Sequence, residues 1–230
     1  MITLVVADDQ ALVRSGLSSI LSKDPAFSVV GEAADGAEAV ELARSHRPDI
    51  VLMDLRMPNV DGLEATRRIL QGDDPPRVVV LTTFDTDDNV YAALRAGASG
   101  FLLKDTSPEH LADALRRVMD GDAMLSPTVT RRLVDSFVSE PPRPDGSVPA
   151  ALRTLSDREL EVLRVLARGT TNAEIACELY LAETTVKSHI ARLLTKLGLR
   201  DRVQAVVLAH ESGLMRTGQT GSRATGDARR

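Results

Sequence analysis

Short aliphatic runs alternate with longer amphipathic stretches through the first half of the chain. The runs consist almost entirely of Val, Ile and Leu, which is typical of strands buried on both faces of a parallel sheet. They predict strands at residues 3–7, 27–33, 49–54, 77–83 and 100–104. The amphipathic stretches predict helices near residues 11–22, 36–46, 62–71, 86–96 and 107–120. This alternation favours a doubly wound α/β domain with a five-stranded parallel sheet, of the flavodoxin-like kind, over residues 1–121.

The second half of the chain shows a different pattern. Residues 139–150 are rich in Pro, Gly and Ser, so we expect residues 122–150 to form a linker, with a short helix within residues 126–138. Residues 151–215 show only helical periodicity and predict an all-α domain of four helices. Residues 216–230 have no aliphatic pattern, and we expect a disordered tail there.

The third predicted helix of the all-α domain is the most regular. Its apolar face is formed by Val186, Ile190, Leu193, Leu194 and Leu197. Its opposite face carries Lys187, Ser188, Ala191, Arg192 and Thr195, with Lys196 at the margin. Two helices joined by a tight turn, the second with such a face, indicate a helix-turn-helix that enters the major groove of DNA. On charge alone, an ordinary solvated helix face would be the better interpretation.

Signals at the ends of the helices accompany this periodicity. Ser156 followed by Glu159 predicts a capping box at the start of the first helix of the all-α domain. Asn172 predicts the N-cap of the second helix. Ala182 stands where the third helix should begin and offers no capping oxygen, although Thr184 could shift the start.

Composition narrows the classes of function. The net charge of −5 hides an asymmetry, because residues 1–121 carry 12 Lys and Arg against 20 Asp and Glu (net −8). Residues 148–216 carry 10 against 8 (net +2), so the two domains face different partners. The single cysteine, Cys177, excludes an internal disulfide and fits a reducing compartment. No secretory signal opens the chain and no run approaches the roughly 20 apolar residues of a membrane span, so we expect a soluble, cytoplasmic protein.

Polar side chains stand where the predicted strands end. Asp8 and Asp9 follow the first strand, and Asp54 ends the third. Thr82 ends the fourth strand and Lys104 the fifth. Because the first and third strands of such a sheet are neighbours, three carboxylates should converge beside a lysine. Their oxygens suit a hard divalent ion, Mg²⁺ above all, and a carboxylate beside Mg²⁺ and lysine can accept a phosphoryl group.

A plainer interpretation is that each of these aspartates only caps the helix that follows its strand. That interpretation is adequate for any one of them alone. The combination of three carboxylates with Thr82 and Lys104 at one edge of the sheet favours a chemical site instead.

Four segments resemble the receiver domain of two-component response regulators, across residues 1–121. They are VVADDQALVRSGL, DIVLMDLRMPNVDGLEATRRI, VVVLTTFD and ALRAGASGFLLKD. The resemblance implies that Asp54 accepts the phosphoryl group. The ligands that it implies for Mg²⁺ or Mn²⁺ are Asp8, Asp9, Asp54 and the backbone carbonyl of Arg56.

The same resemblance implies which residues respond to the phosphoryl group. Thr82 takes the place of the switch hydroxyl, with Thr83 as the second candidate, and Lys104 matches the lysine that contacts the phosphoryl group. Phe101 stands where relatives often carry Tyr, so an inward motion is implied without a phenolic hydrogen bond. Gly62 matches the loop after the phosphoacceptor, where glycine would permit a backbone geometry that other residues resist.

The all-α domain is similar to the LuxR-type helix-turn-helix nearly end to end, including REL-EVL, N-EIA, TVKSH and KLG. Together with the receiver, it resembles the NarL/FixJ family of response regulators, which act as transcription factors. The DNA contacts that this implies are Thr184, Thr185, Lys187, Ser188, Ala191, Arg192, Thr195 and Lys196. Residues of the fourth helix, near residues 201–212, would pack on the third helix or make a homodimer contact: Val203, Val206, Val207 and His210.

We therefore expect a DNA-binding response regulator that a histidine kinase phosphorylates on Asp54. Phosphorylation would draw Thr82 and Phe101 inward and promote dimerisation and binding of a double-stranded DNA operator. One rival is an enzyme, but haloacid dehalogenase-like phosphatases place an acidic proton donor two residues after the nucleophile, where this chain has Arg56. The other rival is a DNA-binding regulator that is independent of phosphorylation and uses the receiver only for dimerisation, and the sequence leaves it open.

Overall fold

The computed structural model describes residues 1–82, 87–119, 121 and 150–216. These residues belong to two compact units, which are described separately below. Thr83, nearly all of the predicted linker with its short helix, and all but the first residue of the predicted tail lie outside the described residues.

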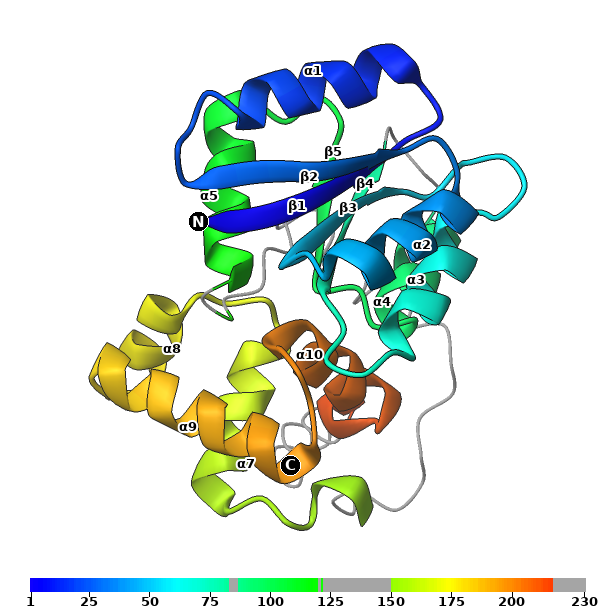
Figure 1. Cartoon of the computed structure of the whole chain (residues 1–230). Coiled ribbons are helices and arrows are strands. Elements are labelled where there is room, and N and C mark those ends of the chain that lie inside the picture. Colours follow the sequence, from blue (N-terminus) through cyan, green and yellow to red (C-terminus); the bar gives the residue numbers. More distant parts are fainter. Residues whose placement is uncertain (83–86, 120, 122–149, 217–230) are drawn as a thin grey trace, which may run out of the picture. The chain divides into compact units, whose positions relative to one another are not determined.

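The first unit is built around a parallel sheet with strand order β2-β1-β3-β4-β5 (Figure 1). Its strands are β1 (Ile2–Ala7), β2 (Phe27–Ala33), β3 (Ile50–Asp54), β4 (Arg77–Thr82) and β5 (Gly100–Leu103). Its helices are α1 (Ala11–Leu21), α2 (Gly36–His46), α3 (Gly62–Leu70), α4 (Asp87–Arg95) and α5 (Pro108–Met119). The predicted fold is confirmed, and each predicted boundary agrees to within one residue.

Alternate residues of each strand fill two separate cores, which is why the strand sequences are apolar throughout. Leu4 and Val6 of β1 point to the side that α1 and α5 cover, where they pack with Leu115. Val5 of β1 points to the opposite side, which α2 and α3 cover, and packs with Ala39 there. Figure 1 shows these helices on the two faces of the sheet. A continuous apolar run is therefore the expected sequence of a strand in the middle layer.

The loop between β3 and α3 is held against the end of β3. The N–H of Gly62 donates a hydrogen bond to the carbonyl of Leu55 at 3.0 Å, and the N–H of Gly36 donates one to the carbonyl of Val60 at 3.0 Å. A Cβ on Gly62 would lie only 1.9 Å from the backbone oxygen of Asp54. Gly62 is not among the described residues with positive φ, so the predicted reason for a glycine there is wrong. The absence of a side chain is required by close packing rather than by backbone conformation.

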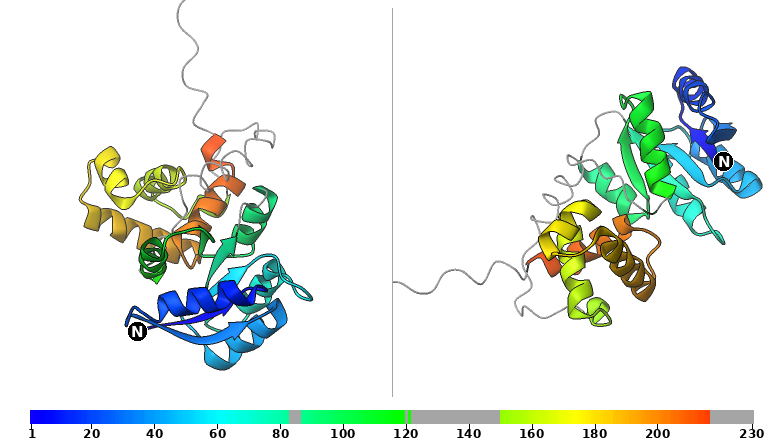
Figure 2. Two further views of the ribbon diagram at one scale, coloured as in Figure 1. Left: turned by 90° about the horizontal axis from the view of Figure 1, so that it is seen from above. Right: turned by 90° about the vertical axis from the view of Figure 1, so that its left-hand side faces the viewer.

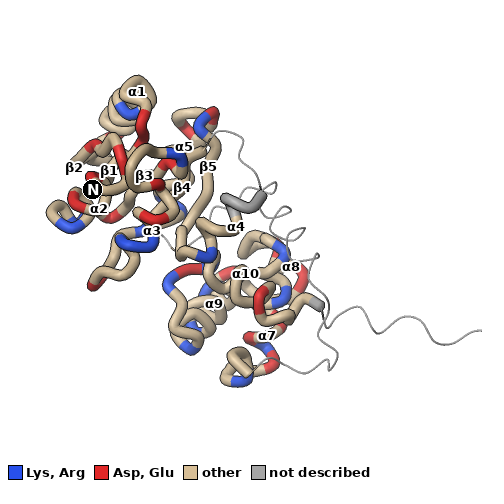
Figure 3. Tube along the Cα trace, turned by 90° about the vertical axis from the view of Figure 1, so that its right-hand side faces the viewer, with Lys and Arg blue, Asp and Glu red and all other residues tan. Residues whose placement is uncertain are grey.

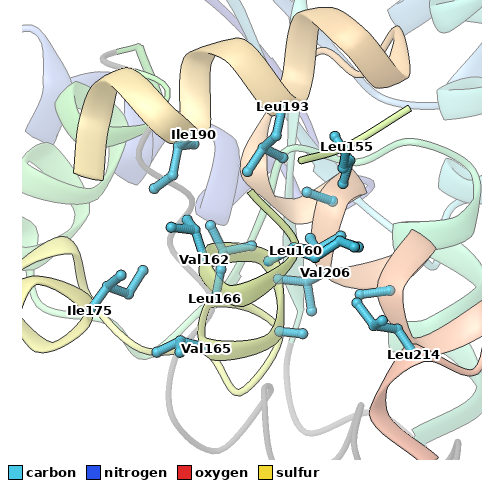
Figure 4. Packing of buried hydrophobic residues seen from close by; sticks show 14 of the residues in the cluster. Leu155, Leu160, Val162, Val165, Leu166, Ile175, Ile190, Leu193, Val206 and Leu214 are labelled. Carbon is cyan, nitrogen blue, oxygen red and sulfur yellow. The ribbon is translucent and has the colours of Figure 1, made fainter. Parts of the chain in front are cut away.

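The second unit contains the four predicted helices, here α7 (Asp157–Leu166), α8 (Asn172–Leu179), α9 (Glu183–Leu197) and α10 (Arg202–Glu211). Short 3₁₀ helices stand at Ala150–Leu152 and Leu214–Arg216. Figure 2 shows this group of helices from two further directions. Their apolar faces meet in one cluster, in which Ile190 and Leu193 of α9 point toward Val162 and Leu166 of α7 (Figure 4). The predicted apolar face of the third helix is confirmed.

The ends of these helices agree with the sequence at the start of α7 and disagree with it at the start of α8. The Ser156–Glu159 capping box is present at α7, as predicted. The prediction for α8 is wrong by one residue, because Thr171 is the N-cap and forms a second capping box with Glu174. Asn172 is instead the first helical residue and is buried.

The start of α9 carries no side-chain cap. Ala182 occupies the N-cap position in extended conformation, and α9 begins directly after it at Glu183. Thr184 does not shift the start of the helix. The first turn of α9 therefore lacks the capping oxygen that Ser or Thr would supply, and the N–H of Thr185 instead donates to the carbonyl of Ala182 at 2.9 Å.

Two of the residues predicted on the fourth helix serve the interior of the second unit. Val206 is buried in the apolar cluster. His210 is buried, and its Nε2 lies 2.9 Å from the carbonyl oxygen of Ala167, which ends α7. In the part of the chain that the structure describes, no helix is long and apolar enough to cross a membrane.

The contact between Gly62 and Asp54 gives a prediction for the receiver unit. We expect Gly62→Ala to destabilise the unit by about 3 kcal/mol, because the added methyl group meets backbone that cannot move without displacing the end of β3. Urea unfolding of the full-length protein, followed by circular dichroism, measures the change.

Gly16 provides the matched control in the same unit. A Cβ there has nothing within 4 Å, and the residue lies inside α1. Gly16→Ala should stabilise the unit by about 0.5–1 kcal/mol, because alanine has the higher helix propensity. Equal effects of the two substitutions would contradict the close packing described here.

Candidate phosphoacceptor pocket and DNA-binding helix

Three carboxylates meet where β1 and β3 end. The two strands pair in parallel register, with Ala7 beside Met53, so the residues that follow are also neighbours. Asp8, Asp9 and Asp54 each offer an oxygen within 4.8 Å of the others. Asp8 and Asp54 are buried, at 1% and 4% exposure, whereas Asp9 is exposed and leaves one side of the cluster open.

Lys104, directly after β5, neutralises the buried part of this cluster. Its Nζ lies 2.6 Å from Oδ2 of Asp8 and 2.9 Å from Oδ2 of Asp54. Its backbone N–H donates a hydrogen bond of 2.8 Å to the carbonyl of Thr82, which joins the ends of β4 and β5. The structure therefore brings together the three aspartates and the lysine that the sequence placed at one edge of the sheet.

Burial and charge act in opposite directions on these groups. Burial raises the pKa of Asp54 above its usual value, and the Asp8 carboxylate adds to this, although Lys104 and the backbone N–H of Arg56 partly oppose it. For Lys104, burial alone would lower the pKa, but hydrogen bonds to Asp8 and Asp54 outweigh it and the pKa is raised. The lysine therefore stays charged, and further positive charge at the site would favour the ionised form of Asp54.

Other aspartates, rather than these three, cap the neighbouring helices. Asp35 accepts the N–H of Glu38 at the start of α2, and Asp61 accepts the N–H of Glu64 at the start of α3. The N-cap of α1 is Gln10, which makes no side-chain capping bond. The plain capping interpretation therefore does not explain why the three carboxylates are there.

Arg14 supports the acidic cluster, and sequence reasoning missed it. Its Nη1 donates a hydrogen bond of 2.6 Å to the backbone carbonyl of Asp8, and its Nε lies 3.9 Å from Glu32 on β2. Glu32 also accepts a 2.6 Å hydrogen bond from Ser18 on α1. These contacts tie α1 to the end of β1. The helical spacing of Arg14 and Ser18 was visible in the sequence, but their shared partner lies on a different strand.

The remaining predicted residues lie around this pocket. Thr82 is buried at the end of β4, at 2% exposure. Arg56 is exposed, and its backbone N–H donates a hydrogen bond to the Asp54 carboxylate. Phe101, on β5, is buried at 2% exposure.

The polar face of α9 lies at the surface. Its exposed residues are Thr184, Lys187, Ser188, Ala191, Arg192, Thr195 and Lys196, and Thr185 is half-buried. The hydroxyls of Ser188 and Thr195 donate to carbonyls of their own helix, one turn earlier, at 3.0 Å in each case. Figure 3 shows basic positions in blue along this helix.

Lys196 differs from the other basic residues of α9 because it has a partner inside the unit. Its Nζ lies 2.7 Å from Oε2 of Glu159 on α7. The Lys196 hydrogen bond, followed by the backbone N–H of Ser156, lowers the pKa of Glu159 from 4.5 to about 2. A lowered folded-state pKa stabilises the fold above the unfolded-state value, so this contribution is complete above about pH 4.5 and is lost as the pH falls toward 2.

Known proteins match both units. A family model of the response regulator receiver domain matches residues 4–116, and one of bacterial regulatory proteins of the luxR family matches residues 153–209. Transcriptional regulatory protein LiaR of Bacillus subtilis is 40% identical over 215 residues, which are 94% of this chain and 100% of LiaR. Oxygen regulatory protein NreC of Staphylococcus carnosus is 38% identical over 213 residues, which are 92% of this chain and 98% of NreC.

Solved structures of response regulators also align with nearly the whole chain. The response regulator ChrA of a heme-sensing two-component system aligns with a TM-score of 0.51 and 36% identity, over 93% of this chain and 98% of ChrA. A structure of two RcsB dimers bound to two parallel DNAs aligns with a TM-score of 0.53 and 25% identity, over 93% of this chain and 98% of RcsB.

A receiver domain joined to a LuxR-type helix-turn-helix domain is the composition of a DNA-binding response regulator of a two-component system. The chain belongs to the NarL/FixJ family of these regulators, a family of transcription regulators rather than of enzymes. The predicted family and class of function are confirmed.

The missing cap of α9 gives a prediction for the DNA-binding unit. Ala182→Ser should stabilise this unit by about 0.5–1 kcal/mol, because the serine oxygen can accept an N–H of the first turn. Thermal unfolding of the full-length protein measures the shift.

Thr171→Ala is the reverse control, because it removes the cap that α8 already has. It should cost about the same amount. If Ala182→Ser has no effect while Thr171→Ala destabilises the unit, α9 does not begin where the structure places it.

Proposed function

We propose that this protein is a transcription factor that a histidine kinase controls by phosphorylation of Asp54. The observation that carries the proposal is the contact of Lys104 with both Asp8 and Asp54 at the edge of the sheet, within a three-carboxylate cluster. The same chain carries an exposed basic helix face in a LuxR-type domain. A phosphorylation site and a DNA-binding site are the input and the output of such a regulator.

The carboxylate cluster fits a magnesium ion. Its donors are hard oxygens, they converge to within 4.8 Å, and the exposed side of Asp9 leaves room for water and a phosphate oxygen. Asp8, Asp9, Asp54 and the backbone carbonyl of Arg56 would hold Mg²⁺, or Mn²⁺ in its place. When bound, the ion would neutralise negative charge on the transferring phosphoryl group.

Asp54, Lys104 and Thr82 would each have a separate role in phosphoryl transfer. An oxygen of Asp54 forms a bond to phosphorus while the bond from phosphorus to the histidine nitrogen of the kinase breaks, and the departing imidazole takes up a proton from water. The Lys104 ammonium stabilises the phosphoryl oxygens, since it already lies 2.9 Å from Asp54. Thr82, buried at the end of the next strand, supplies the switch hydroxyl.

The phosphoryl group would remain on Asp54 long enough to serve as a signal. Haloacid dehalogenase-like phosphatases need an acidic proton donor two residues after the nucleophile. This chain has Arg56 at that position, and its guanidinium does not deprotonate. We therefore expect no turnover of an external phosphoester.

The output of the protein would be binding of double-stranded DNA by α9. Lys187 and Arg192 are exposed cations of its polar face, and the small side chain of Ala191 between them allows close approach of the duplex. Thr184, Thr185, Ser188 and Thr195 complete the proposed surface. The RcsB structure contains dimers on DNA, and we propose that phosphorylation promotes a similar homodimer here, whose two helices bind two half-sites in the cytoplasm.

The rival function that the sequence leaves open is a regulator that binds DNA independently of phosphorylation and uses the receiver only for dimerisation.

Phosphorylation by acetyl phosphate tests the pocket. With Mg²⁺, the wild-type protein should incorporate one phosphoryl group, and Asp54→Asn should incorporate none, because its amide is not a nucleophile of this kind. Intact-protein mass spectrometry measures the uptake. Asp105→Asn, which changes an exposed carboxylate next to Lys104, is the control and should react like wild type. Phosphorylation of the Asp54→Asn protein would show that another residue is the acceptor.

DNA sites selected from a random pool distinguish the two candidate functions. We expect phosphorylated protein to bind the selected duplex more tightly than unphosphorylated protein and to show a dimer mass in light scattering, because two linked binding units raise avidity. Identical DNA binding and identical mass with Asp54 fully phosphorylated would favour the phosphorylation-independent regulator.

A further inference from the structure

Glu159 uses one carboxylate oxygen both for its capping box and for an ion pair with another helix. Its Oε2 accepts the backbone N–H of Ser156 at 2.8 Å and the hydroxyl of Ser156 at 2.9 Å. The same oxygen accepts the Lys196 ammonium at 2.7 Å. Glu159 is 4% exposed, although it is charged and lies in the first turn of its helix.

The chain contains its own comparison for this arrangement. Glu174 forms the equivalent capping box at α8, with the N–H of Thr171 at 2.6 Å and its hydroxyl at 3.0 Å. Glu174 is exposed, and its lowered pKa is due only to its hydrogen bonds with Thr171. Capping alone therefore requires neither burial nor a lysine, so the contact with Lys196 needs a different explanation.

The position of Lys196 supplies that explanation. It lies in the last turn of α9, where Leu197 also packs on the apolar cluster, as Val186, Ile190 and Leu193 do farther toward the start of the helix. These apolar contacts are not directional, so they do not by themselves define the rotation of the helix about its axis. The short charge-assisted hydrogen bond from Lys196 to the buried carboxylate of Glu159 is directional and adds that constraint at the last turn.

We propose that Glu159 is a positioning residue for the recognition helix: it fixes α9 on α7 through Lys196, and Lys196 does not neutralise a DNA phosphate. The inference rests on the proposed DNA-binding role of α9. It removes Lys196 from the predicted DNA contacts and assigns it a role inside the domain. Lys187 and Arg192 remain as the basic residues of α9 that face the duplex.

Glu159→Gln tests the positioning role, since glutamine at this position keeps the capping box and removes only the charge. In the full-length protein, amides of α9 should exchange with deuterium about tenfold faster, and affinity for the selected DNA should fall about tenfold. Glu174→Gln is the matched control and should change neither quantity. Equal exchange and equal affinity in the two variants would refute the positioning role.

The salt dependence of DNA binding tests the role of Lys196 directly. Each phosphate contact contributes about 0.9 to the slope of log K against log salt concentration, so Lys187→Gln should reduce the slope by about that amount. Lys196→Gln should weaken binding while leaving the slope unchanged, and Lys196→Arg should restore the affinity. A reduced slope for Lys196→Gln would make Lys196 a phosphate contact and overturn the inference.

The two proposals fail in different ways. If the wild-type protein binds no DNA from the random pool, the proposed function fails. The exchange of α9 amides in Glu159→Gln and Glu174→Gln would still decide whether Glu159 holds the helix.

Discussion

The Lys104 ammonium is the charge on which the receiver pocket depends. Asp8 and Asp54 are both buried and lie against each other, an arrangement that desolvation and repulsion disfavour unless a cation is present. The cation comes from the end of β5, whereas the carboxylates come from β1 and β3. The site is therefore complete only when β1, β3 and β5 have assembled into one sheet. Correct folding of the whole receiver unit is a condition of its chemistry.

A similar ion pair performs a different task in the second unit. Lys104 faces two carboxylates with an open side beside them, so its charge remains available to a phosphoryl group. Lys196 faces one carboxylate that two groups of Ser156 already hold, and nothing in that arrangement requires a ligand. In the two proposals, the partners of each lysine, rather than the residue type, separate a charge used for chemistry from a charge used to position a helix.

The sequence predicts the sheet and the pocket well because both follow from local patterns. Continuous apolar runs require strands buried on two faces, and the carboxyl ends of those strands place Asp8, Asp54 and Lys104 together. It fails where the cause is a contact between distant segments. Glu159 and Lys196 are 37 residues apart, and no period connects them. The need for a glycine at position 62 is set by the backbone of β3, which local geometry does not reveal.

The ends of β4 and β5 are joined beside the proposed phosphoacceptor. A phosphoryl group shifts a conformational equilibrium only by as much as it binds one state better than the other. In the proposed function, that difference would arise at Lys104, which would exchange one carboxylate contact for oxygens that carry more negative charge, and at Thr82, whose carbonyl accepts the backbone N–H of Lys104. The connection between the ends of β4 and β5 would then be the element through which a signal at Asp54 leaves the pocket.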